Sequence, residues 1–118
     1  MLPKRYRLTR SEDFARIREM GECFTARRLV LCYQRNDGVG LRVGFSVSKR
    51  VGGAVVRNRV KRRLRANMCA LCEVIEPGWD VVVIARQQAS TATSSQLNTE
   101  LDQLLHKAHL FKASVHGA

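Results

Sequence analysis

The stretch that decides the fold runs from residue 42 to residue 65, RVGFSVSKRVGGAVVRNRVKRRLR. Its first residues alternate between large apolar and small side chains, which predicts a β-strand over about 41–48. Gly52 and Gly53 then allow a tight turn. From Ala54 to about Cys72, apolar residues recur at helical spacing and predict a long helix with one apolar seam. The seam residues are Val56, Val60, Leu64, Met68 and Leu71.

The same stretch carries an unusual positive charge. Between Lys49 and Arg65 there are eight Lys or Arg residues and no acidic residue. The whole chain has a formal net charge of +11. Cations at that density repel one another unless a polyanion neutralises them. The sequence therefore predicts nucleic acid or another polyanion as the partner of this helix.

The predicted strand over 41–48 has two different faces. One face is apolar and belongs to the core, with Val43, Phe45 and Val47. The other face is small and partly hydroxylated, with Gly44, Ser46 and Ser48. Two interpretations stay open for this second face. A helix covers it, or a ligand backbone lies against it.

The remaining elements follow from periodicity, caps and turn signals. Ser11 is expected to cap the first helix, and Leu29–Tyr33 is expected to be a central strand. The full prediction is helix 11–20, strands 23–27, 29–33 and 41–48, helix 54–72, strand 80–86, loop 88–95 and a last helix from Ser94 or Ser95 that buries Leu97, Leu101, Leu104, Leu105, Ala108 and Phe111. This order, α-β-β-β-α-β-α, predicts one α+β domain over 1–118, with a basic arm at 1–10 and a frayed tail at 112–118.

Four cysteines are present, Cys23, Cys32, Cys69 and Cys72. We expect them to be reduced, buried or half-buried thiols. The alternative is a zinc site in which Cys69-x-x-Cys72 is joined by the other two cysteines. No glycine turn is present to form a zinc knuckle, so the spacing favours thiols over zinc.

The sequence indicates a binder and not a catalyst. It contains no clustered carboxylates, no phosphate loop of the Walker type and no pair of histidines placed for acid–base chemistry. His106 and His109 are expected on a solvated helix face. No catalytic residue and no protein-held metal are therefore predicted. The absence of a signal peptide and of an apolar run of roughly 20 residues predicts a cytoplasmic protein that does not bind a membrane.

RNA is favoured over DNA as the polyanion. A strand and a glycine turn precede the basic helix, so no helix-turn-helix pair is available to enter a major groove. A sheet with a small polar face and nearby aromatics, Phe14 and Tyr33, instead suits a single strand that lies in a groove.

These residues closely resemble the signature of the bacterial ribonuclease P protein subunit. In that family a Gly-x-x-x-Ser-Lys-Lys strand end leads through Gly-Asn-Ala-Val to an Arg-Asn-Arg helix. Here the matching segments are Gly44–Arg50, Gly52–Val55 and Arg57–Arg59. The likeness also covers the Ser-Glu-Asp-Phe of the first helix and the Asp-Val-Val-Val-Ile-Ala-Arg strand.

The resemblance implies a fold and a mechanism. The family fold is an α/β sandwich with a four-stranded sheet and a left-handed βαβ crossover, similar to the second domain of ribosomal protein S5. The protein is the partner of a catalytic RNA that removes the 5′ leader from precursor tRNA. That RNA, with bound Mg²⁺, hydrolyses the phosphodiester, and no organic cofactor or obligate protein partner is expected. The protein binds the RNA and holds the leader in a cleft between the basic helix, the first helix and the sheet.

The resemblance also assigns site residues by position. The RNA-contacting segment matches Lys49, Arg50, Arg57, Asn58, Arg59, Lys61, Arg62 and Arg65. The leader cleft matches Phe14, Val30 and Cys32, and the small strand face adds Ser46 and Ser48. Three positions depart from the family pattern: Gly53 stands where Asn is common, Arg18 where a second cleft Phe is common, and Cys32 where Tyr is common.

Two further functions remain as alternatives. One is a basic structural RNA-binding protein of ribosomal type. The other is a zinc-bearing DNA-binding module that uses the four cysteines. For Phe14 the alternative to a cleft residue is a core residue, because it begins the apolar seam of the first helix.

Overall fold

The computed structural model describes residues 6–8, 10–36, 38 and 40–112. Its elements are α1 (Ser11–Met20), β1 (Glu22–Thr25), β2 (Leu29–Arg35), β3 (Arg42–Val47), α2 (Ala54–Leu71), the 3-10 helix η2 (Cys72–Val74), β4 (Trp79–Ala85), the 3-10 helix η3 (Gln87–Thr91) and α3 (Ser94–Lys107). The predicted α-β-β-β-α-β-α order is confirmed. Most of the basic arm, most of the C-terminal tail, His116 and part of the turn at 36–38 lie outside the described residues.

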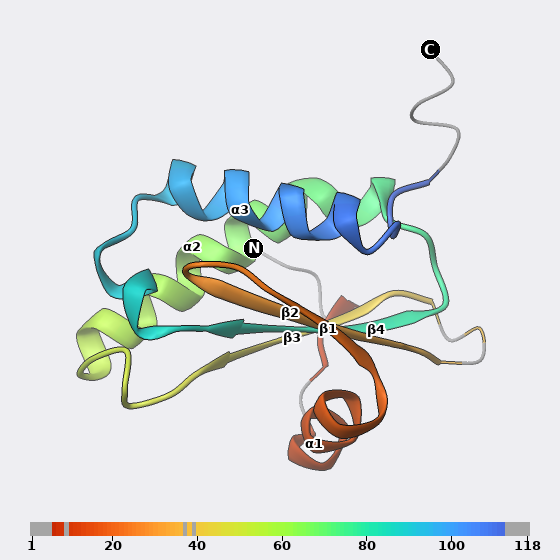
Figure 1. The fold of residues 1–118 in the computed structure, drawn as a ribbon, viewed down its shortest axis with the longest axis horizontal. Coiled ribbons are helices and arrows are strands. Elements are labelled where there is room, and N and C mark those ends of the chain that lie inside the picture. Colours follow the sequence, from red (N-terminus) through yellow and green to blue (C-terminus); the bar gives the residue numbers. More distant parts are fainter. Residues whose placement is uncertain (1–5, 9, 37, 39, 113–118) are drawn as a thin grey trace.

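The four strands form one mixed sheet in the order β1-β2-β4-β3. β1 pairs with β2, and β2 with β4, in antiparallel fashion, whereas β3 and β4 are parallel. The parallel strands β3 and β4 and the helix α2 between them form the βαβ unit for which the family resemblance implies a left-handed crossover. Helices α2 and α3 cover one face of the sheet and α1 covers the other (Figure 1).

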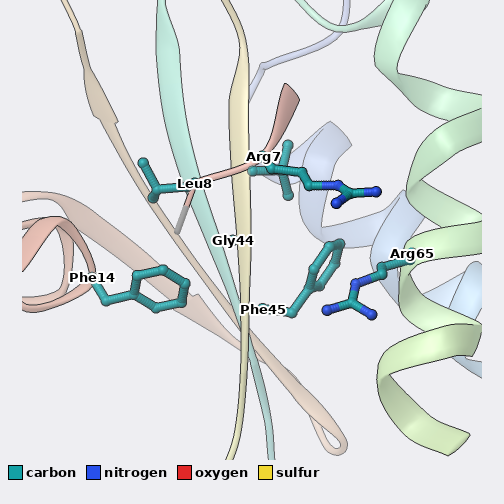
Figure 2. A pocket seen from close by; sticks show the side chains of 7 residues that line it. Arg7, Leu8, Phe14, Gly44, Phe45 and Arg65 are labelled. Atoms are coloured by element: carbon teal, nitrogen blue, oxygen red, sulfur yellow. The ribbon is translucent and has the colours of Figure 1, made fainter. Parts of the chain in front are cut away.

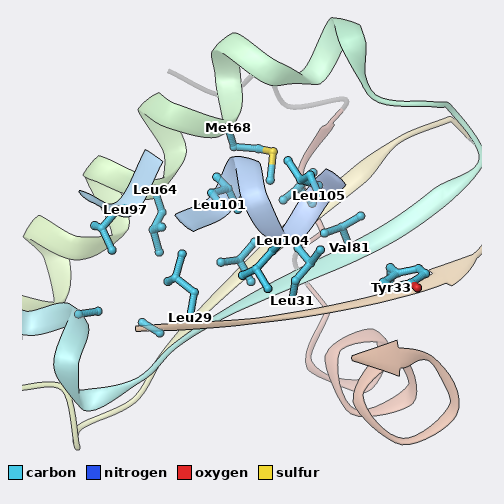
Figure 3. Close-up of a cluster of buried hydrophobic side chains, with 14 of the residues drawn as sticks. Leu29, Leu31, Tyr33, Leu64, Met68, Val81, Leu97, Leu101, Leu104 and Leu105 are labelled. Carbon is cyan, nitrogen blue, oxygen red and sulfur yellow. The ribbon is translucent and has the colours of Figure 1, made fainter. Parts of the chain in front are cut away.

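The near-continuous apolar runs of the two central strands are explained by this three-layer arrangement. Alternate residues of β2, such as Leu29 and Leu31, are fully buried in the larger core beneath α2 and α3 (Figure 3). Their neighbour Cys32 points the other way, into a smaller cluster with Leu8, Ile17 and Val82 beneath α1. Each strand therefore contributes to two apolar layers.

The prediction of four reduced thiols is wrong for one pair. Cys23 and Cys32 lie directly opposite each other on β1 and β2, and their sulfurs form a disulfide. The sequence did not reveal it because the pairing depends on the register of the two strands, and one residue of slip would separate the side chains. Cys69 and Cys72 are free thiols, as expected, and burial raises the pKa of Cys72 to about 11.

Three local predictions also need correction. Ser11 is the first residue of α1 and not its cap; Arg10 occupies the cap position and its side chain makes no capping bond. The segment expected as a loop over 88–95 contains the short helix η3. Ser48 lies beyond the end of β3, in an exposed turn.

Candidate nucleic-acid interface

The predicted RNA-contacting residues lie together on α2 and on the turn before it. Lys49 and Arg50 are exposed in that turn, Asn58 and Arg62 are exposed on the helix, and Lys61 and Arg65 are half-buried beside them. The apolar seam of α2 faces the core, with Val60, Leu64 and Met68 buried. Within the described ranges, no ion pair involves a cation from Lys49 to Arg65. The charge is thus anchored to the core and left uncompensated.

Two arginines of α2 have partners within the chain. Arg59 donates from Nη2 to the carbonyl of Ser90 at 3.1 Å, and Arg63 donates from Nη1 to the carbonyl of Ala92 at 2.6 Å. These bonds attach α2 to the connection between β4 and α3. Arg59 therefore has a structural contact in addition to its predicted role in RNA binding. The Nε atoms of Arg57 and Arg59 are buried and have no hydrogen-bond partner among the described residues.

The N-terminus of α2 adds to the positive potential. Gly53 occupies the cap position, so no side chain caps the helix, and the first turn contains no acidic residue. Gly52 has a φ of +155°, and a Cβ at this position would meet Val56. A glycine is needed there because both the backbone conformation and the space exclude a side chain. The first-turn N–H groups, which no side chain caps, and the helix dipole therefore add positive potential at the helix end that follows Lys49 and Arg50 in the chain.

The small face of β3 is covered by α1 at one end and open at the other. The ring of Phe14 packs against Gly44 so closely that any Cβ there would overlap it. Further along the strand, Ser46 lines a hollow of about 300 Å³ together with Ser11, Phe14 and Arg18. The first interpretation therefore holds for Gly44, which a helix covers. Ser46 opens to a hollow, and a ligand at this residue stays a prediction.

The other predicted cleft residues have mixed positions. Phe14 and Val30 are half-buried and pack against the small cluster beneath α1. Cys32 is 1% exposed and bonded to Cys23, so its side chain offers no surface to a ligand. Ser48 is exposed near Lys49 and belongs to the turn before α2.

A second hollow lies at β3 beside α2 and includes residues that the sequence analysis did not select. It has a volume of about 200 Å³ and is lined by Arg7, Leu8, Phe14, Val43, Gly44, Phe45 and Arg65 (Figure 2). Arg7 reaches it because residues 7–8 run along β3, with a hydrogen bond from Leu8 N to Val43 O. The sequence signals for Arg7 were the basic character of residues 1–10 and the opening Arg-Leu of the family resemblance, and neither assigned it to a site.

Other arginines serve the fold. Arg42 and Arg16 both donate to the carboxylate of Asp80, which is fully buried and also accepts from Asn36. Burial raises the pKa of Asp80, but the hydrogen bonds from Arg42, Asn36 and Arg16 outweigh it and hold that pKa below its ordinary value. This cluster joins α1, β3 and β4, and Asp13, which also accepts from Arg16, supplies the second carboxylate that balances the two arginines.

The described residues do not form a protein-held metal site. They bring together no group of three His, Cys, Asp or Glu side chains that would hold a metal ion. The Cys23–Cys32 disulfide removes two of the four thiolates that the zinc alternative requires. In the same part of the chain, no helix is long and apolar enough to cross a membrane.

Residues 2–109 match the family model described as Ribonuclease P. The chain belongs to the ribonuclease P protein family. Its curated relatives include the ribonuclease P protein component of Oceanobacillus iheyensis, 37% identical over 94% of this chain and 93% of the relative. The same component of Beutenbergia cavernae is 48% identical over 86% of this chain and 87% of the relative.

Solved ribonuclease P proteins share the fold. The protein from Staphylococcus aureus superimposes with a TM-score of 0.81 at 36% identity, covering 91% of this chain and 98% of that one. The protein from Thermotoga maritima superimposes with a TM-score of 0.76 at 28% identity, covering 86% of this chain and 96% of that one. The family and fold that the sequence motifs implied are thereby confirmed.

Proposed function

We propose that this chain acts as the protein subunit of ribonuclease P, which binds the catalytic RNA and the 5′ leader of precursor tRNA and assists removal of the leader. The observation that carries the proposal is the uncompensated positive surface of α2 in a member of this family. We propose that the chain acts in the cytoplasm, because precursor tRNA is its proposed substrate.

The catalytic RNA is assigned to α2 because this surface has the charge and geometry that a phosphate backbone requires. Arg62 and Lys61 project from the helix without partners in the described chain, and Lys49 and Arg50 extend the same surface past the helix N-terminus. Arginine binds two phosphate oxygens with its planar fork. Asn58, exposed between Arg57 and Arg59, is placed to donate to a phosphate or a sugar hydroxyl.

The leader is assigned to the hollow between α1 and β3. Ser11, Phe14, Arg18 and Ser46 line it and supply one ring, one cation and two hydroxyls. Arg18 stands where the family commonly has a second aromatic residue, so this hollow offers more charge and less stacking area. We expect binding here to depend on salt more than in relatives with two aromatic residues.

Hydrolysis is assigned to the RNA partner and its Mg²⁺. The described residues bring together no group of three His, Cys, Asp or Glu side chains, which supports this assignment. The contribution of this chain is to neutralise phosphates and to hold the leader, which lowers the cost of bringing two polyanions together.

Reconstitution tests the proposal. The purified chain is added to a cognate ribonuclease P RNA at low Mg²⁺, and cleavage of precursor tRNA is followed. We expect a higher cleavage rate, or tighter binding of precursor than of mature tRNA. RNA binding without any gain in cleavage or substrate affinity would contradict the proposal and support the structural, ribosomal-type alternative.

A further inference from the structure

The Cys23–Cys32 disulfide joins two residues in very different surroundings. Cys23 is exposed on β1, which is an edge strand of the sheet. Cys32 lies directly opposite on β2 and is 1% exposed. Its side chain packs with Ile17 in the small cluster beneath α1. One half of the disulfide therefore faces solvent, and the other half belongs to the contact between α1 and the sheet.

The disulfide also holds the C-terminal end of α1. This helix ends at Met20, and Cys23 is the second residue of the strand that follows, so Gly21 alone separates the helix from the strand. Gly21 lies so close to the main chain of β2 that a Cβ there would overlap the carbonyl of Tyr33. Figure 1 shows the chain passing directly from α1 into β1. The bond between the two cysteines thus fixes the end of α1 to β2.

The position of α1 determines the shape of the hollow that we assign to the leader. Three of its four lining residues, Ser11, Phe14 and Arg18, belong to this helix, and Ser46 on β3 is the fourth. Arg18 is the cation of the hollow and lies in the last turn of α1, next to the disulfide-linked strand.

Noncovalent contacts hold the middle of α1 independently of the disulfide. Arg16 donates to Asp80 on β4 at 3.0 Å, and Ile17 is fully buried against the sheet. Reduction of the disulfide would therefore leave the helix docked and remove the covalent constraint from its last turn alone.

We propose that Cys23–Cys32 is a reversible thiol–disulfide site, and that its reduction loosens the last turn of α1 and weakens binding of the leader. The proposal rests on the proposed function and deepens it, because it adds regulation to the same site. Thiol reductants make persistent disulfides rare in the cytoplasm, and those that form there are usually catalytic or redox-sensing. An exposed disulfide in a chain that acts there is open to exchange.

Reduction by a low-molecular-weight thiol takes two exchange steps. The first thiolate attacks the sulfur of Cys23, the bond between the cysteine sulfurs breaks, and Cys32 leaves as a thiolate that takes up a proton. A second thiolate attacks the small-molecule sulfur of the mixed disulfide and releases Cys23, which is protonated in turn. Two electrons pass to the protein and the two small thiols end as one disulfide. That small disulfide reverses both steps.

Titration of the full-length chain with mixtures of reduced and oxidised glutathione tests reversibility. After alkylation, trypsin separates Cys23 from Cys32, because two arginines lie between them, and places the other two cysteines on a third peptide. We expect the disulfide-linked peptides to disappear as reduced glutathione rises and to return with oxidised glutathione. Linkage that persists in excess reduced glutathione would overturn the proposal, as would no linkage in excess oxidised glutathione.

The reconstituted holoenzyme tests the effect on the leader. Reducing the parent chain should weaken binding of precursor tRNA about fivefold, the lower end of typical coupling between two sites, and leave mature tRNA unchanged. Cys23→Ser keeps a small exposed side chain but cannot form the disulfide, so it should bind like the reduced parent with or without reductant. Equal precursor binding by the oxidised and reduced parent would overturn the proposal. An equal response of Cys23→Ser to reductant would do the same.

Two further measurements locate the coupling. Amide hydrogen exchange at residues 17–21 should be faster in the reduced chain, with exchange in α3 unchanged, and identical exchange at 17–21 in both redox states would contradict the loosening. By linkage, bound precursor tRNA should make the disulfide harder to reduce by the same factor of about five, which is about 20 mV in reduction potential. Mature tRNA should leave that potential unchanged.

These experiments separate the redox site from the proposed function. A holoenzyme without any gain in cleavage removes the proposed function, whereas glutathione titration and hydrogen exchange of the free chain still report on the disulfide and on α1. Normal stimulation of cleavage together with precursor binding that is independent of redox state removes the redox proposal alone.

Discussion

Helices α2 and α3 lie on the same face of the sheet but are stabilised in opposite ways. α3 begins with a capping box formed by Thr93 and Gln96 and ends with His106 and Lys107 in its last turn, where positive charge suits the helix dipole. α2 has no side-chain cap, no acidic residue in its first turn and no basic residue in its last. Its cations lie along its middle, where they repel one another.

The two helices also differ in how many side chains they bury in the core. α3 buries four leucines and one glutamate in 14 residues, whereas α2 buries three side chains in 18. Features worth about 0.5–2 kcal/mol each, such as an N-cap, are present in α3 and absent from α2. We infer that the positive surface of α2 lowers the intrinsic stability of this helix. Packing against α3 and the sheet then stabilises α2 in the folded chain.

The largest expected effect is on α3. Glu100 is 6% exposed and accepts hydrogen bonds from the backbone N–H groups of Arg28 and Leu29 and from the Arg28 side chain. Glu100→Ala leaves these donors unpaired and should lower the free energy of unfolding by about 3 kcal/mol, measured by urea denaturation. Asp102→Ala, at a half-exposed carboxylate two residues later, should cost less than about 1 kcal/mol.

Effects of intermediate size are expected at two neighbouring arginines of α2, on RNA affinity for one and on stability for the other. Arg62 is exposed and Arg63 donates to the Ala92 carbonyl. Arg62→Ala should weaken binding to ribonuclease P RNA roughly tenfold with unfolding unchanged, because one phosphate contact is lost. Arg63→Ala should lower the free energy of unfolding by about 1–2 kcal/mol and change RNA affinity less. The reverse pattern would mean that partners within the chain do not identify the arginines that bind RNA.

Removing the cap of α3 should have a smaller effect. Thr93 accepts a hydrogen bond from the Gln96 N–H at 3.1 Å, and the Gln96 side chain accepts from the Thr93 N–H. Thr93→Ala should lower the free energy of unfolding by about 1 kcal/mol without altering RNA affinity. Thr99→Ala, on the exposed face of the same helix, is the matched control and should change little.

The smallest effect comes from giving α2 the cap that it lacks. Gly53 has a φ of −69° and open space around its Cβ position, so a side chain fits without strain. Gly53→Asn should raise the free energy of unfolding by a few tenths of a kcal/mol. Thermal unfolding should detect the gain, and Gly53→Asp should show a similar gain but bind RNA more weakly because it adds a negative charge. Unchanged RNA binding by Gly53→Asp would place the helix N-terminus outside the interface.

The sequence predicted the features that local periodicity determines. The predicted helices over 11–20 and 54–72, and the predicted strand over 80–86, came within one residue of the observed boundaries, because hydrophobic spacing and breaker residues report on a single element. The family motifs around Arg57–Arg59 identified the fold because they are specific to one family. The basic surface of α2 was predicted independently, from the density of cations and the helical spacing of the apolar seam.

Features that depend on contacts between distant segments could not be predicted. The Cys23–Cys32 disulfide requires the register of β1 against β2. Arg62 and Arg63 are equivalent in sequence, and only the position of Ala92, 29 residues later, gives Arg63 a partner. Phe45 was assigned to the core because its strand alternates regularly, but the hollow formed with Arg7 and Arg65 leaves part of its ring exposed.

The bond from Arg59 to Ser90 would make the connection between β4 and α3 a thermodynamic partner of the RNA, if Arg59 binds a phosphate as predicted. A phosphate that takes the Arg59 Nη2 donor would compete with the Ser90 carbonyl, so RNA binding and the local order of residues 87–93 would share free energy. The exchange is reciprocal by linkage. Amide hydrogen exchange at residues 87–93 would then report how tightly α2 binds RNA, although these residues are outside the predicted RNA-contacting segment.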